Sequence, residues 1–271
     1  MIDAQGTPSL PNAKVALVLS NRKAAYGLTR AQNADPPIPT QVLALQPYLK
    51  ANPGKTRDDY DYEVSKIVLA ASPDLVVLAG WMHVLGDTFL KEVESENVPV
   101  INLHPALPGA FDGVNSIQRA FEAFGRGEIE HSGVMVHKVI REVDRGEPVL
   151  VRTVEIKKED TLEDFEQRVH QTEWGVIVEA TKIVLESRRY VVSFRAGWVR
   201  FDPSLAAKIP RYRVYIQETK KYGNCAHNFT GMAPTIHRSL PSSTNPPDPV
   251  NLRPDMPKPR AHSRSSALPA S

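Results

Sequence analysis

The chain has 271 residues, 41% of them hydrophobic, which is enough for one large α/β domain or two small ones. Its single cysteine, Cys225, excludes a disulfide framework, and no apolar run approaches the roughly 18 residues of a membrane span. The start, MIDAQGT, has no signal-peptide pattern. The sequence therefore predicts a soluble, cytoplasmic protein with no membrane partner.

The net charge of +2 conceals an asymmetry between the two ends of the chain. Residues 1–187 hold 19 Lys and Arg against 27 Asp and Glu, whereas residues 188–271 hold 14 against 4. A basic tail can bind nucleic acid. This tail lacks the interleaved aromatic residues on which bases stack, so we interpret it as a solvated extension and expect no nucleic-acid partner.

Short apolar runs alternate with amphipathic stretches along the first two thirds of the chain. Strands are expected at residues 14–20, 41–45, 75–79, 98–103, 131–140 and 148–156. Helices are expected at residues 23–33, 57–71, 87–94, 116–124 and 161–187, the second of them capped by Thr56. This alternation predicts a three-layer, Rossmann-like α/β fold with a mixed, mainly parallel sheet.

The pattern divides the chain into three parts. Residues 1–187 are the expected catalytic domain, residues 188–230 a poorly defined extension, and residues 231–271 a Pro-, Ser- and Arg-rich tail that we expect to be disordered. Within the extension, Tyr190–Phe194 and Trp198–Phe201 are candidate short strands.

The strand at 98–103 ends in a polar pair, Asn102 and His104. Residues two apart on a strand project from the same face, so an amide that can polarise a carbonyl lies beside an imidazole that can move protons. Ligands of open α/β sheets bind just outside the carboxyl ends of strands. The pair therefore indicates acyl transfer, although a capped strand end with a surface histidine is the alternative.

Two further features support a site at this end of the sheet. Asp144 lies in the turn between two later strands, where a carboxylate can orient an imidazole or merely accept from backbone amides. The strand at 75–79 ends at Gly80 and continues into a mostly apolar loop that could wall a slot for a flat heterocycle, or simply pack in the core.

Four blocks of sequence carry a resemblance to a known family. They are Asp74–Met82, Ile101–Pro105, His131–His137 and Glu142–Pro148, and their order and spacing resemble the folate-dependent formyltransferases. The match covers about residues 13–187. Within the family, the chain is most similar to the members that formylate glycinamide ribonucleotide in purine biosynthesis.

The resemblance implies a role for each matching residue. Asn102 would hydrogen-bond the formyl oxygen, His104 would transfer a proton, and Asp144 would hold the histidine and an ordered water. His137 would lie near the site, and Glu173 would hold the ribonucleotide. The residues expected to contact the co-substrate 10-formyltetrahydrofolate are Arg57, Met82, His83, Val84, Leu85, Ile140, Arg141, Glu142 and Val143. No metal is expected, because the formyl carrier is already activated and no histidine spacing suggests zinc.

The resemblance also implies a difference at the start of the chain. Family members begin with a strand, a Gly-Ser-Asn loop and a helix N-terminus that holds the substrate's phosphate. Residues 1–4 match the end of that helix, so we expect the strand and loop to be absent and the neighbouring sheet edges to be exposed. Either the functional protein is longer, or this form is impaired. Other acceptors, hydrolysis of formyl-folate, or an inactive remnant with an RNA-binding tail remain alternatives.

Overall fold

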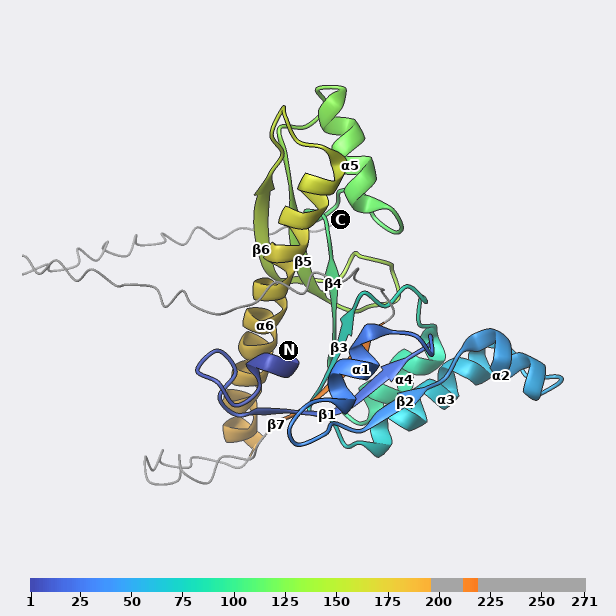
Figure 1. Ribbon diagram of the computed structural model, residues 1–271. Helices are drawn as coiled ribbons and strands as arrows, with labels where there is room; N and C mark the ends of the chain where they lie inside the picture. The colour runs from blue at the N-terminus through green and yellow to red at the C-terminus, as the bar shows by residue number, and fades with distance from the viewer. Residues whose placement is uncertain (196–211, 219–271) are drawn as a thin grey trace, which may run out of the picture. The chain divides into compact units, whose positions relative to one another are not determined.

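The computed structural model describes residues 1–195 and 212–218. Within these residues, seven strands form one sheet in the order β2-β1-β7-β3-β4-β5-β6 (Figure 1). The strands are β1 (Ala13–Ser20), β2 (Thr40–Val42), β3 (Leu75–Ala79), β4 (Val100–His104), β5 (His131–Lys138), β6 (Pro148–Glu155) and β7 (Tyr212–Glu218). The pairs from β2 to β4 are parallel, and β5 is antiparallel to both β4 and β6. The predicted mixed, mainly parallel sheet is confirmed.

The helices connect these strands and cover both faces of the sheet (Figure 1). They are a 3-10 turn η1 (Ile2–Ala4), α1 (Tyr26–Gln32), α2 (Leu45–Ala51), α3 (Arg57–Ala70), α4 (Asp87–Ser95), α5 (Ser116–Gly125) and α6 (Leu162–Arg195). The predicted cap of α3 is present as a capping box: Thr56 accepts from the backbone of Asp59, whose carboxylate accepts from the backbone of Thr56. None of the helices in the described part of the chain is long and apolar enough to cross a membrane.

Strand β3 shows how the three layers arise from sequence. It is apolar throughout, as is typical of a parallel strand buried on both faces. Leu75 and Val77 join a core cluster that includes side chains of α1, α5 and α6, whereas Val76 and Leu78 join a second cluster with α3 and α4. Because side chains alternate along a strand, this one segment supports a helical layer on each face.

Strand β7 corrects the expectation of exposed sheet edges. It lies in the middle of the sheet, parallel to both neighbours: Val214 is level with Val15 of β1 and with Leu75 of β3. A segment from the predicted extension thus occupies the place between β1 and β3. The neighbouring edges are paired rather than open, and backbone hydrogen bonding continues across the sheet.

The structure departs from the predicted elements at two other places. The seven-residue helix α2 was not expected and includes Leu45, the last residue of a predicted strand. Tyr190–Phe194, a candidate strand, is part of α6, which continues to Arg195. The candidate strand Trp198–Phe201 and the predicted disordered tail, 231–271, lie outside the described residues. Residues 190–194, of which Val191 and Val192 are β-branched, therefore continue the helix that precedes them.

Candidate active site

Strand β4, which lies between β3 and β5 in the sheet, carries both residues of the predicted polar pair, Asn102 and His104. Asn102 is level with Leu78 of β3 on one side and with His137 of antiparallel β5 on the other. His104 is the last residue of β4, and its side chain is 4% exposed. The switch from parallel to antiparallel pairing at β4 brings His137 beside Asn102, which the position of these residues in the sequence does not indicate.

The loop between β5 and β6 brings Asp144 to the same place. Asp144 has a left-handed backbone conformation, with φ of 56°, which among residues other than glycine is adopted mostly by asparagine, aspartate and histidine. Two residues on, Gly146 passes so close to β5 that an added Cβ would lie 1.7 Å from the carbonyl oxygen of Lys138. Glycine at 146 is therefore required for this loop path, and the path sets the position of Asp144.

The carboxylate of Asp144 is the centre of the cluster. Its Oδ1 lies 3.3 Å from Asn102 Nδ2 and 3.4 Å from His137 Nε2. Its Oδ2 lies 3.4 Å from His104 Nδ1 and accepts from the backbone N–H of Gly113 at 2.9 Å. Asp144, His104 and His137 are all buried. The structure thus brings together all three predicted catalytic residues, has His137 beside them as the resemblance implies, and adds the Gly113 amide.

The hydrogen bonds of His137 restrict its protonation. Its Nδ1 lies 2.9 Å from the carbonyl oxygen of Lys138, and since a carbonyl can only accept, Nδ1 carries a proton. In the neutral ring, Nε2 is then an acceptor for Asn102 Nδ2 at 3.2 Å. Both amide protons of Asn102 are thereby used, one toward His137 and one toward Asp144. An oxyanion that receives a hydrogen bond from Asn102 must replace one of these two acceptors.

The environment shifts the pKa values of the two central groups downward. Burial lowers the pKa of His104 below its usual 6.5, and the nearby Asp144 charge only partly opposes this. Burial acts to raise the pKa of Asp144, but the contact with His137, the hydrogen bond from the Gly113 amide and the nearby imidazoles outweigh it and lower the pKa. At neutral pH the site therefore holds a neutral imidazole against an ionised carboxylate.

One atom of this cluster has no hydrogen-bond partner. Nε2 of His104 is buried and unpaired, while Nδ1 of the same ring faces Asp144. A buried polar atom without a partner carries a desolvation cost, and such groups are concentrated at sites that react with a ligand. In the tautomer with the proton on Nδ1, which faces the Asp144 carboxylate at 3.4 Å, Nε2 presents a lone pair that can accept a proton.

Two loops beside the cluster expose apolar side chains. Met82 and Val84 follow β3, and Ile140 and Val143 follow β5; each of the four is more than 40% exposed. Arg141 of the second loop lies 3.5 Å from Asp87 at the start of α4, so the two loops are neighbours. These exposed apolar side chains on adjacent loops are candidates for the walls of the predicted folate slot.

The other residues predicted to contact folate have different surroundings. Arg57 donates to the carbonyl oxygen of Val84 at 2.5 Å, so it holds a slot loop in place. Leu85 is buried in the core, and Glu142 is exposed in the β5–β6 turn. His83, in contrast, turns inward: its Nε2 lies 2.6 Å from Asp61 on α3. The sequence-based prediction missed Asp61, although a carboxylate in line with the buried Val64 and Val68 of α3 could have revealed it.

Glu173, the predicted ribonucleotide ligand, lies on α6. Its side chain is buried, and its carboxylate lies 2.7 Å from Nδ1 of His170 one turn earlier. Helix α6 packs against β3, β5 and β6 of the sheet that carries the cluster. The described contacts place its carboxylate with His170 rather than with Asn102 or His104.

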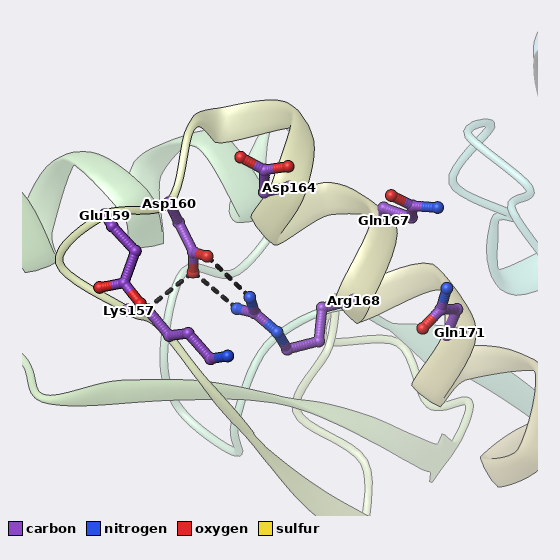
Figure 2. A pocket seen from close by; sticks show the side chains of 7 residues that line it. All are labelled: Lys157, Glu159, Asp160, Asp164, Gln167, Arg168 and Gln171. Atoms are coloured by element: carbon purple, nitrogen blue, oxygen red, sulfur yellow. Dashed lines mark hydrogen bonds and ion pairs between the residues drawn. The ribbon is translucent and has the colours of Figure 1, made fainter.

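A polar hollow of about 410 Å³ lies elsewhere, at the first turns of α6 (Figure 2). Its residues are Lys157, Glu159, Asp160, Asp164, Gln167, Arg168 and Gln171. Arg168 binds both carboxylate oxygens of Asp160, at 2.6 and 2.7 Å. The hollow contains none of the predicted site residues. Across residues 1–195 and 212–218, no group of three His, Cys, Asp or Glu side chains is arranged to hold a metal ion.

Comparison with known proteins gives one consistent result. A family profile described as formyl transferase matches residues 1–181. The phosphoribosylglycinamide formyltransferase of Dictyostelium discoideum is 48% identical over 178 residues, which cover 64% of this chain and 85% of that protein. The Saccharomyces cerevisiae protein of the same name is 46% identical over 197 residues, 69% of this chain and 90% of its own length.

Solved structures agree with the sequence relatives. The crystal structure of phosphoribosylglycinamide formyltransferase from Bacillus halodurans is similar with a TM-score of 0.57 and 30% identity. The match covers 68% of this chain and 87% of that one.

Proposed function

The chain belongs to the formyl transferase family, and we propose that it transfers a formyl group from 10-formyltetrahydrofolate to the amino group of glycinamide ribonucleotide. The observation that carries this proposal is the buried His104, oriented by Asp144 and unpaired at Nε2, beside the amide of Asn102. Relatives named for this activity match most of their own length. The small-molecule substrates, and a place in purine biosynthesis in the cytoplasm, are parts of the same proposal.

The reaction requires an acceptor for one proton and a donor to one oxyanion. The amine nitrogen of the ribonucleotide attacks the formyl carbon, and the carbonyl π electrons move to its oxygen. Asn102 donates to that oxygen after releasing either Asp144 or His137. Nε2 of His104 takes the proton that the attacking amine loses, and Asp144 stabilises the resulting imidazolium.

Collapse of the tetrahedral intermediate completes the transfer. The oxygen lone pair re-forms the carbonyl, the bond between the formyl carbon and N10 of the folate breaks, and the imidazolium returns its proton to N10. The products are formylated ribonucleotide and tetrahydrofolate, and His104 is again neutral. The lowered pKa of His104 suits this role, because the ring must be neutral before it can accept a proton.

The proposed binding surfaces follow from the exposed residues. Met82, Val84, Ile140 and Val143 form apolar walls on which the folate heterocycle packs. Glu173 would hold the ribonucleotide after exchanging its contact with His170 for one with the substrate. Arg141 and Glu142 are exposed at the rim of the slot.

The test measures tetrahydrofolate formation from 10-formyltetrahydrofolate with and without glycinamide ribonucleotide. The proposal predicts product only when the ribonucleotide is present, and one formylated ribonucleotide for each tetrahydrofolate. Release of formate without the ribonucleotide would identify a hydrolase instead. Absence of any turnover by a folded protein that binds both substrates would contradict the proposal.

A further inference from the structure

The loop that follows β3, residues 81–86, has two faces with opposite surroundings. Exposure alternates along it: Trp81 8%, Met82 47%, the His83 side chain 9%, Val84 48% and Leu85 7%. An extended segment with this alternation directs one set of side chains to the interior and the other outward. Met82 and Val84 are therefore the face that can meet a ligand, and His83 belongs to the inner face.

The inner face of this loop is attached to α3 at three points. Nε2 of His83 lies 2.6 Å from Oδ1 of Asp61, and the backbone N–H of Gly86 donates to Oδ2 of Asp61 at 2.8 Å. Arg57, one turn earlier on α3, donates to the carbonyl oxygen of Val84. Residues four apart share one face of a helix, so a single face of α3 holds the loop at its middle and its end.

Asp61 is the central point of this attachment. Its side chain is fully buried, and both of its carboxylate oxygens are used by the loop. The His83 ring is also fixed edge-on by Tyr60, at 5.2 Å between ring centroids, and by Trp81, at 6.1 Å. A buried carboxylate is retained only where its hydrogen bonds are satisfied, and here both bonds go to a loop without regular secondary structure.

We propose that Asp61 is a positioning residue for the formyl donor. Through His83 and Gly86 it holds residues 81–86 in the conformation that turns Met82 and Val84 toward the folate, and His83 acts through this contact rather than by touching the donor. The inference rests on the proposed function, because it assigns the exposed face of the loop to the folate. It replaces direct contact by His83 with an indirect role.

The experiment compares Asp61→Ala with Asp61→Asn. Alanine removes both hydrogen bonds, and we expect KM for 10-formyltetrahydrofolate to rise at least about tenfold while kcat changes less than about threefold. Asparagine can still accept from Gly86 through Oδ1 and donate to Nε2 of His83 through Nδ2, so KM should stay within about threefold of wild type. Glu63→Gln, on the same helix but paired with Lys66 at the surface, is the matched control and should change neither constant.

A second variant, Gly86→Ala, tests the same contact in case Asp61→Ala does not fold. In Gly86→Ala the new Cβ lies 3.0 Å from Oδ2 of Asp61, so the carboxylate must shift by a few tenths of an ångström, which weakens its bond to Gly86 while His83 still pairs its charge. We expect a rise in KM for the folate of about threefold with kcat retained. Equal losses in kcat and in the KM of both substrates, unchanged KM, or asparagine no better than alanine would each overturn the inference.

Direct binding separates this inference from the proposed function. Calorimetric titration with tetrahydrofolate needs no turnover, and it should show the same weakening in Asp61→Ala as the kinetic KM. If wild type binds tetrahydrofolate but transfers no formyl group, the proposed function fails while the role of Asp61 is still measurable. If wild type turns over normally and Asp61→Ala binds tetrahydrofolate as wild type does, only the positioning role fails.

Discussion

Asp144 and Asp160 are both carboxylates that meet cationic or titratable groups, yet their surroundings differ. Asp160 at the polar hollow is bound by both terminal nitrogens of Arg168, which holds its pKa at about 2 (Figure 2). The carboxylate of Asp144 lies 3.4 Å from a nitrogen of each of two histidines, His104 and His137. The backbone of Asp144 is left-handed, and Nε2 of the neighbouring His104 has no hydrogen-bond partner.

The difference between the surroundings of Asp160 and Asp144 indicates which of the two places is the reactive centre. The hollow is an open cavity of about 410 Å³, but its ion pair is complete and its partner, arginine, does not release a proton at physiological pH. In the buried cluster the partners of Asp144 are imidazoles, its backbone is left-handed, and one buried atom lacks a hydrogen-bond partner. What distinguishes the proposed site is an unpaired imidazole nitrogen beside a carboxylate and an amide in one buried cluster.

Removal of the proposed oxyanion donor, Asn102, tests whether the buried cluster is the reactive centre. In Asn102→Ala we expect kcat to fall about 10²–10³-fold, because one donor to the developing charge is lost. KM for either substrate should change far less. Steady-state kinetics at saturating folate measures this, and a kcat within threefold of wild type would exclude Asn102 as the donor.

Asp144→Asn keeps the shape of the cluster but removes its charge. We expect kcat/KM to fall about 10²-fold, since the His104 imidazolium is no longer stabilised. Asp144 raises the pKa of His104, so its removal lowers that pKa further. The acid limb of kcat/KM, which should already lie below pH 6.5 in wild type, should therefore move to lower pH. A pH–rate profile checks this, and movement to higher pH would contradict the assignment.

Gly146→Ala tests the loop path that sets Asp144. The added Cβ would lie 1.7 Å from the Lys138 carbonyl oxygen, so the loop must shift away from β5. We expect kcat to fall about tenfold, together with a lower melting temperature, because a displacement of an ångström at a catalytic group is costly. Thermal denaturation and turnover are measured on the same preparation. Gly125→Ala, where nothing lies within 4 Å of an added Cβ, is the control.

Arg168→Ala at the hollow should have the smallest effect on catalysis. It removes the partner of Asp160, and we expect a lower melting temperature with kcat and both KM values unchanged within about twofold. A tenfold loss of kcat in a folded Arg168→Ala protein would place chemistry in the hollow and reverse the comparison.

Local sequence was sufficient for much of the fold. Continuous apolar runs such as β3 and the capped start of α3 are signals that neighbouring residues carry by themselves. Helix α2 was missed because it is short and contains Pro47. Strand β7 pairs with residues far away in the chain, and no local pattern reveals which gap a strand fills. We propose that the domain continues through β7 rather than ending at residue 187.

Part of the candidate site could be predicted from the sequence, and part depends on contacts between distant residues. The order of the four sequence blocks predicted that Asn102, His104 and Asp144 belong together, and the structure brings them into contact. The inward orientation of His83 could not be predicted, because it depends on Asp61, which is 22 residues earlier on another element. Which side of a loop faces a ligand is decided by such tertiary contacts rather than by the loop's own residues.

The most direct test of the account is the turnover of His104→Ala with both substrates saturating, measured beside His131→Ala, an exposed histidine on β5. If His104 is the proton acceptor, its variant should lose about 10³-fold or more in kcat while remaining folded, and the His131 variant should match wild type. Equal turnover by the two variants would contradict the central claim that the buried cluster around Asp144 carries out formyl transfer.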